Sequence, residues 1–229
     1  MLSPRNFPDA PAVPAARPTP AARGLARRRV LLEGPVGATL ARLALPNIAV
    51  VAAQTLVTFA DAWYVGRLGV AGLAALALVF PIQAMMSMMS AGAMGGGISA
   101  AVARALGAGD REKAEALVIH ALLIGLGMAA GFTLLFGVLA QPFFMLLGGR
   151  GAALEGAVAY AHILFGGAAL VWLANTLASI LRGTGNTAAP GLILTITQLF
   201  GVALSGALTF GWGGLPALGI RGPAAAFIT

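Results

Sequence analysis

A carboxylate stands in a long apolar stretch of the chain, on the same helical face as three uncharged polar residues. Asp61 follows an uncharged run from Leu43 to Ala60. Each residue of an α-helix advances by about 100°, so residues 7, 11 or 14 positions apart return to nearly the same face. The residues at that spacing are Asn47, Gln54, Thr58 and Asp61. A carboxylate inside a membrane is costly and marks a functional site by default, so Asp61 is the first candidate for holding an ion or a proton.

Three later apolar stretches carry polar residues that also gather on one face. Gln83, Ser87 and Ser90 share a face, with Met86 and Met94 beside it. Further along the chain the sets are Asn175, Thr176 and Ser179, and then Thr195, Gln198, Ser205 and Thr209. Such side chains hold membrane helices together, at about 0.6 kcal/mol per hydrogen bond, or line a polar cavity. Taken singly, the serines and threonines favour helix packing. Taken together, the stripes indicate a shared cavity, for which the candidate residues are Asp61, Gln54, Thr58, Asn47, Asn175 and Gln198, with Asp61 as a possible Na⁺ or H⁺ site.

Composition identifies a polytopic membrane protein. The 229 residues are 59% hydrophobic and 9% charged, whereas soluble chains carry about 25% charged residues. The chain has no cysteine, which excludes disulfides, thiolate catalysis and cysteine metal sites. The net charge is +7, but six of the fourteen basic residues precede position 30 and most others flank apolar runs. That distribution is typical of orientation signals, so we expect no nucleic-acid partner.

Five stretches are long enough to cross a bilayer, which takes about 20 apolar residues. They run approximately over 40–65, 72–105, 114–139, 153–181 and 188–211. The second is long and should tilt or protrude. A sixth begins near Gly219 and stops at Thr229, so we expect a fragment or a truncated reading frame of a longer protein.

The tail and the loops set the expected orientation. Residues 1–38 are rich in Pro, Ala and Arg, which is typical of a disordered tail. A cytoplasmic N-terminus places eleven of the basic residues inside and Arg67, Arg150 and Arg221 outside. Positive charge favours the inner side, so we expect the tail to be cytoplasmic and the protein to lie in the plasma (inner) membrane.

Motifs for catalysis are missing from the sequence. It contains no GxSxG and no HExxH, and its two histidines are 42 positions apart. The glycine-rich stretch from Ala91 to Ala101 is followed by no GK[ST], which argues against a phosphate loop. In a membrane helix such glycines favour close approach of a neighbour or bending. We therefore do not expect an enzyme or a bound cofactor.

Four segments, in order along the chain, resemble the multidrug and toxic compound extrusion (MATE) family. They are ARLALPNIAVVAAQTLVTFADAWYVGRLGVAGLAALAL, AVARALGAGDREKAE, ILRGTGNTAAP and GLPALGIRGPAAAFIT. The resemblance extends from about residue 38 to the end. It implies a twelve-helix transporter of two six-helix lobes around a central cavity, with residues 39–229 as the N-terminal lobe, truncated in helix 6. Its activity would be the exchange of H⁺ or Na⁺ for organic, often cationic, compounds.

The resemblance places the family's cation-coupling aspartate at Asp61. The pattern departs in the fifth helix, where many members carry Asn–x–x–x–Asp and this chain has Gly201 and Ser205. Either Gln198, Gln54 or Asn175 substitutes for the missing groups, or coupling resides in the absent C-terminal lobe. The implied partners are a small organic substrate, the lipid bilayer and that second lobe.

Two alternatives stay open. A lipid-linked precursor flippase of the same superfamily would favour a large cationic cavity, but the polar stripes contain no Lys or Arg. A non-transporting membrane fragment or scaffold is the alternative from another class, because half a cavity cannot alternate its access.

Overall fold

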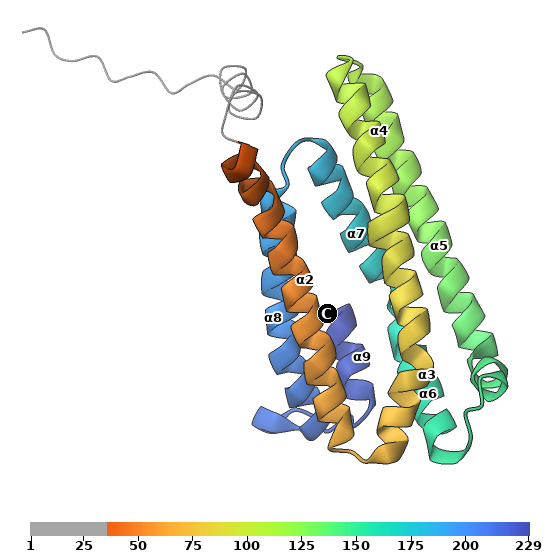
Figure 1. Cartoon of the computed structure of the whole chain (residues 1–229). Helices are drawn as coiled ribbons and strands as arrows, with labels where there is room; N and C mark the ends of the chain where they lie inside the picture. Colours follow the sequence, from red (N-terminus) through yellow and green to blue (C-terminus); the bar gives the residue numbers. More distant parts are fainter. Residues whose placement is uncertain (1–35) are drawn as a thin grey trace, which may run out of the picture. The chain divides into compact units, whose positions relative to one another are not determined.

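The computed structural model describes residues 36–229, and every regular element within that range is a helix (Figure 1). The chain divides into two units, Met1–Leu43 and Ala44–Thr229. The first 35 residues of the predicted tail lie outside the described residues, and its last three begin helix α2. The arrangement given below concerns the second unit.

The predicted spans correspond to helices or continuous pairs of helices. The elements are α2 (Val36–Gly66), α3 (Val70–Ser87), a π-helix (Met88–Met94), α4 (Gly95–Gly107), α5 (Arg111–Leu146), α6 (Gly151–Gly166), α7 (Ala168–Gly183), α8 (Ala188–Phe210), a short 3-10 helix (Trp212–Gly214) and α9 (Arg221–Ile228). Four helical stretches are long and apolar enough to cross a membrane, and α6 with α7 forms a fifth across a bend of 47°. The predicted all-α polytopic fold is confirmed.

Helix α5 is longer than the predicted third span, which ends at Leu139. The carboxylate of Asp110 caps its start by accepting a hydrogen bond from the backbone N–H of Lys113 (2.9 Å). The helix continues through Pro142 to Leu146. The helix thus starts at a cap outside the apolar run and ends close to Gly148, which has a positive φ. Hydropathy does not detect either signal, so it underestimates the length of the helix.

The bend between α6 and α7 is stabilised by neighbours on both sides. Thr133 of α5 donates a hydrogen bond to the carbonyl of Phe165 (2.6 Å), next to the break. Gly167 leaves room for Ile228 of α9, whose side-chain carbon would lie 2.6 Å from a Cβ built at that glycine. The fourth span is therefore bent because α9 packs against its middle.

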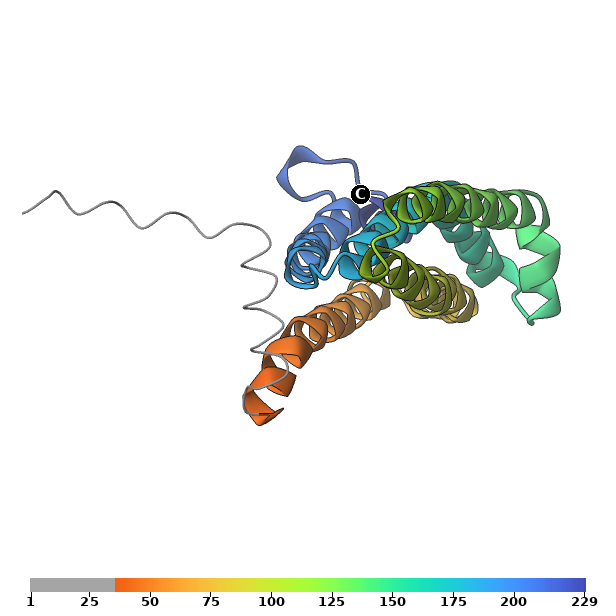
Figure 2. The same ribbon diagram turned by 90° about the horizontal axis from the view of Figure 1, so that it is seen from above.

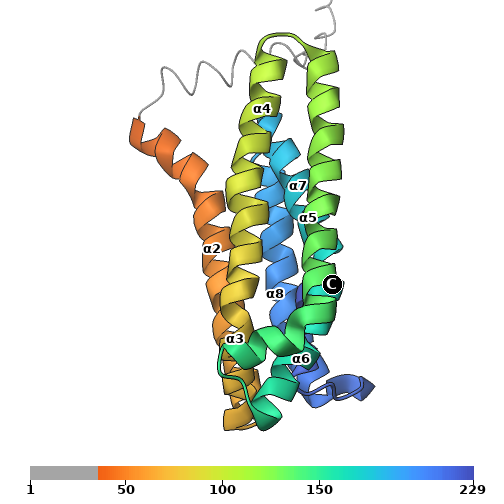
Figure 3. The same ribbon diagram turned by 90° about the vertical axis from the view of Figure 1, so that its right-hand side faces the viewer.

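The core lies where α5, α6 and α7 meet, with α3 packed on α6 and α4 packed on α7 (Figures 1 and 3). Its aromatic rings pack face to face, and the centroids of Phe136 and Phe165 are 4.2 Å apart. Phe132, Phe144 and Trp172 join the same cluster. Seen from above, α7 lies between α8 and the pair α4–α5 (Figure 2). This packed part forms one wall of the lobe, and α8 with α9 packs beside it.

Small residues allow the closest helix contacts. A Cβ at Gly183 of α7 would lie 2.9 Å from the carbonyl oxygen of Ser99 in α4. A Cβ at Gly222 of α9 would lie 2.6 Å from the backbone nitrogen of Thr209 in α8. Backbone atoms cannot rotate aside as a side chain can, so both contacts depend on glycine.

We predict that Gly222→Ala separates α9 from α8 and lowers the free energy of unfolding by about 1–3 kcal/mol, the usual cost of overpacking. Titration of the detergent-solubilised chain with sodium dodecyl sulfate measures this change. Gly131→Ala in α5 is the control, because a Cβ there meets nothing within 4 Å. Equal stability of the two variants would contradict the prediction.

Candidate functional site

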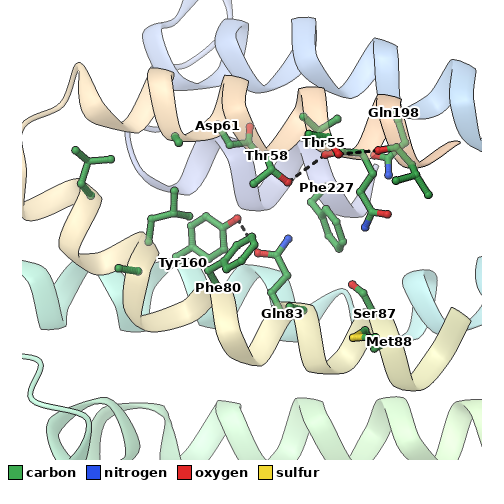
Figure 4. A pocket seen from close by; sticks show the side chains of 18 residues that line it. Thr55, Thr58, Asp61, Phe80, Gln83, Ser87, Met88, Tyr160, Gln198 and Phe227 are labelled. Atoms are coloured by element: carbon green, nitrogen blue, oxygen red, sulfur yellow. Dashed lines mark hydrogen bonds between the residues drawn. The ribbon is translucent and has the colours of Figure 1, made fainter. Parts of the chain in front are cut away.

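A cavity of about 630 Å³ opens between α2 and α3 (Figure 4). Its walls are mainly aliphatic and aromatic, and they come from α2, α3, α6, α8 and α9. The polar residues among them are Gln54, Thr55, Thr58, Asp61, Gln83, Ser87, Tyr160 and Gln198. A mostly apolar hollow with a few polar groups is typical of a site for a small organic molecule.

Asp61 is the one charged side chain among the described residues that line this cavity. It is 8% exposed, and its Oδ1 accepts a hydrogen bond from the hydroxyl of Ser205 in α8 (2.5 Å). Thr209, one turn further along α8, donates to the carbonyl of Ser205 (2.6 Å). The aspartate thus lies at the junction of α2 and α8, with one side open to the cavity.

A smaller hollow adjoins the other side of the aspartate. Its wall includes Asp61, Gln198, Gly201 and Ser205. The two positions where the sequence departs from the family pattern therefore face the predicted site. The hydroxyl of Ser205 donates a hydrogen bond to Asp61, and a Cβ at Gly201 would meet nothing within 4 Å.

Three of the predicted cavity residues line the cavity together with Asp61: Gln54, Thr58 and Gln198. Thr58 donates to the carbonyl of Gln54 (3.1 Å), one turn before it. Figure 4 shows Thr58 and Asp61 on one wall and Gln83 and Ser87 on the opposite wall. The described part of the α2 stripe thus faces the cavity together with Gln198 of α8, whereas Ser205 of the α8 stripe lines the smaller hollow.

Asn175 does not line this cavity. Its side-chain amide donates to the hydroxyl of Ser90 (2.9 Å), so the predicted shared cavity does not extend to α7. Ser90 itself is fully buried and turned away from Gln83 and Ser87. Asn47 belongs to α2, but its side chain lies outside the described residues.

Three aromatic residues of the cavity wall were not predicted from the polar stripes of the sequence: Phe80, Tyr160 and Phe227. Tyr160 of α6 is 1% exposed, and its hydroxyl makes a long hydrogen bond to Oε1 of Gln83 (3.4 Å). The chain has only two tyrosines. Tyrosine usually lies near the membrane surface. Its position deep in an apolar span was therefore the sequence signal that could have identified Tyr160 as a cavity residue. Phe227 comes from an eight-residue helix, which is too short for a periodic pattern.

Aromatic residues close α2 against α8 beyond the aspartate. Gly206 admits the ring of Tyr64, which would lie 2.7 Å from a Cβ at that position. Tyr64 also meets Phe210 and Trp212 edge to face, with centroids 5.9 and 6.3 Å away. Rings with a polar tip are enriched at the membrane surface, and here they join the same two helices that Asp61 and Ser205 join.

Residues 46–205 match the family model described as MatE. The chain is 32% identical over 201 residues to the FAD transporter of Shewanella oneidensis, covering 87% of this chain and 44% of that protein. It is 29% identical over 165 residues to the probable multidrug resistance protein YoeA of Bacillus subtilis, covering 72% and 35%. The chain thus spans less than half the length of the curated relatives it matches.

Solved structures agree with the sequence comparison. The outward-facing conformation of a multidrug resistance MATE family transporter superimposes with a TM-score of 0.72 at 31% identity, covering 82% of this chain and 40% of that one. The family model covers well over half of the chain. The packed helices and the cavity with Asp61 thus belong to a member of the multidrug and toxic compound extrusion (MATE) family.

Proposed function

We propose that this chain is the N-terminal lobe of a secondary transporter that exports an organic cation with aromatic rings in exchange for H⁺ or Na⁺. The observation that carries the proposal is the position of Asp61, a single carboxylate on the wall of an otherwise uncharged cavity. A second lobe completes the cavity, and the N-terminus is cytoplasmic in the inner membrane.

The cavity wall supports the proposed class of solute. Its volume of about 630 Å³ lies within the range of about 300–1,000 Å³ that drug-sized ligands need. The rings of Phe80, Tyr160 and Phe227 offer flat apolar surfaces. A cation over such a ring is attracted by its negative face, and the carboxylate of Asp61 supplies a compensating charge.

The surroundings of Asp61 support a proton or a monovalent ion. Among the described residues, no three His, Cys, Asp or Glu side chains come together as a metal site. A cation at Asp61 would therefore rely on one carboxylate and on neutral oxygens such as those of Ser205 and Gln198. One carboxylate balances one positive charge, so a cationic solute and the coupling ion exclude each other. Rocking of the two lobes would turn this exclusion into exchange.

The similarity to an FAD transporter favours a second candidate, in which the solute is a flavin dinucleotide. Its planar ring system suits the aromatic wall. Its phosphates are anionic, and the lining of this lobe offers a carboxylate and no Lys or Arg. The charge of the cavity therefore favours the cation, and the second candidate requires basic groups from the other lobe.

We predict that Asp61→Asn reduces ion-driven uptake of a cationic aromatic dye into inverted membrane vesicles that contain the two-lobe transporter. We expect a loss of about tenfold or more, since each 1.4 kcal/mol of lost ion binding is a factor of ten. Glu155→Gln is the control, because Glu155 is an exposed carboxylate of α6 outside the cavity.

Undiminished coupled uptake in Asp61→Asn would remove the proposed role of the aspartate. Movement of FAD rather than the dye by the unsubstituted protein would favour the second candidate, and movement of a lipid-linked precursor would favour a flippase. If none of the three compounds moves, the proposed export is contradicted and the non-transporting alternative is favoured.

We predict that Gly201→Leu weakens ion binding beside Asp61 without disturbing the fold. A Cβ at Gly201 meets nothing within 4 Å, so the first carbon of a side chain has room there, and the rest of a leucine would extend into the hollow beside Asp61. We expect the ion concentration for half-maximal uptake to rise about tenfold, which corresponds to about 1.4 kcal/mol of binding. Gly201→Ala should stay close to the unsubstituted protein. Equal ion dependence of all three proteins would show that the hollow is not an ion site.

A further inference from the structure

The second span contains a π-helix, Met88–Met94, between α3 and α4. A π-bulge adds a residue to a helix. Because one residue corresponds to about 100° of rotation, α4 presents a different face from the one that a continuous α-helix would present. On one side of the π-helix α3 packs on α6, and on the other side α4 packs on α7. The bulge therefore sets the rotation between the part of the span that lines the cavity and the part that packs in the core.

This rotation explains why one predicted stripe is divided. In a continuous α-helix, Ser90 and Met94 would share a face with Gln83 and Ser87. In the structure, Gln83 and Ser87 line the cavity. Ser90 faces Asn175 of α7, and the Cε of Met94 lies 3.3 Å from the place of a Cβ at Gly125 in α5. The stripe leaves the cavity at the first turn of the π-helix.

The side chain of Asn175 connects the π-helix to α7. Its Nδ2 donates to the hydroxyl of Ser90 (2.9 Å), and Ser90 donates in turn to the carbonyl of Ser87 (3.2 Å). On the α7 side, the carbonyl of Asn175 accepts from Ser179 (2.7 Å), which also accepts from Nη2 of Arg182 (2.7 Å). Ser90 and Ser179 are fully buried. The chain of hydrogen bonds thus runs from the cavity wall to the end of α7.

The sequence of this segment does not by itself enforce the π-helix. It consists of unbranched and small residues, MMSAGAM, and three glycines follow at Gly95–Gly97. Residues of this kind are compatible with an α-helix as well as a π-helix, and long π-helices are rare. Contacts from outside the segment must select the register. The contact that reaches a polar side chain within the segment is the one from Asn175.

We propose that Asn175 is a positioning residue that holds the π-helical register of Met88–Met94 through Ser90, and so keeps Met94 turned away from the cavity that Gln83 and Ser87 line. Without this hydrogen bond, the α-helical register becomes accessible, and Met94 turns from α5 toward the cavity. The proposal rests on the proposed function only in taking the cavity as the solute site. Its test needs no transport, so the two fail separately.

Absence of cysteine from the chain permits a test by thiol labelling. Met94→Cys is the reporter, and a charged, water-soluble methanethiosulfonate is applied to the chain in membrane vesicles. In combination with Asn175→Leu or Ser90→Ala, we expect the reporter to react about threefold faster, the factor for one interhelical hydrogen bond in a membrane. Exchange of the pair, Ser90→Asn with Asn175→Ser, should restore the slow rate.

Two reference positions separate a change of register from general loosening. Ser87→Cys lines the cavity and should react fast, whereas Ala129→Cys in α5 is 1% exposed and should stay protected. Thr133→Val is the matched control, because it removes a different interhelical hydrogen bond, to Phe165, and should leave the Met94→Cys rate unchanged.

The proposal is overturned if the reporter rate does not rise, if Ala129→Cys accelerates equally, or if the exchanged pair stays fast. Ser90→Ala is the milder change and makes the same prediction if Asn175→Leu does not fold.

Discussion

A carboxylate buried between apolar helices must find a donor, and the hydrogen bond from Ser205 to Asp61 meets this requirement. The bond joins α2 to α8, which otherwise meet through Tyr64 at Gly206 and the aromatic rings beyond it. Because this junction lies at one edge of α2, the opposite edge faces α3 across an open space. The cavity is the space between α2 and α3, where α2 is joined to α8 by Asp61 and Tyr64.

The rest of the described fold is built in the opposite way. Glycines at 95, 125 and 183 bring α4, α5 and α7 so close that an added Cβ would lie within about 3 Å of a neighbour. Lipid tails are as apolar as the side chains, so shape and hydrogen bonding must hold such helices together. The lobe thus has a close-packed part and an open part. The second span belongs to both, because α3 lines the cavity on one side of the π-helix and α4 packs on α7 on the other side.

Sequence reasoning succeeded where a property belongs to one helix and failed where it depends on two. Hydropathy located the spans, and helical spacing placed Gln54, Thr58 and Asp61 on one wall. It could not foresee that α9 bends the fourth span at Gly167, or that a π-helix turns Ser90 toward α7. The sequence prediction for Asn175 was wrong for the same reason. A polar side chain on a membrane helix can line a cavity or bond to a neighbouring helix, and which of the two it does depends on how that neighbour packs. The sequence indicates an incomplete N-lobe site at Gly201 and Ser205, and in the structure the hydroxyl of Ser205 donates a hydrogen bond to Asp61.

The resemblance implies that Ser205 stands where many family members carry an acidic residue, and a serine there would change the charge that this lobe offers. Two carboxylates on one site repel each other when both are ionised, and a cation or a proton between them relieves the repulsion. Asp61 has a neutral partner, so its ionised form needs no second cation. On the proposed function, the lobe then holds either one monovalent ion or one positive group of the solute, and their exchange moves no net charge through this site. Any further charge on the solute must be balanced by the other lobe, whose polarity would decide between an organic cation and a flavin dinucleotide.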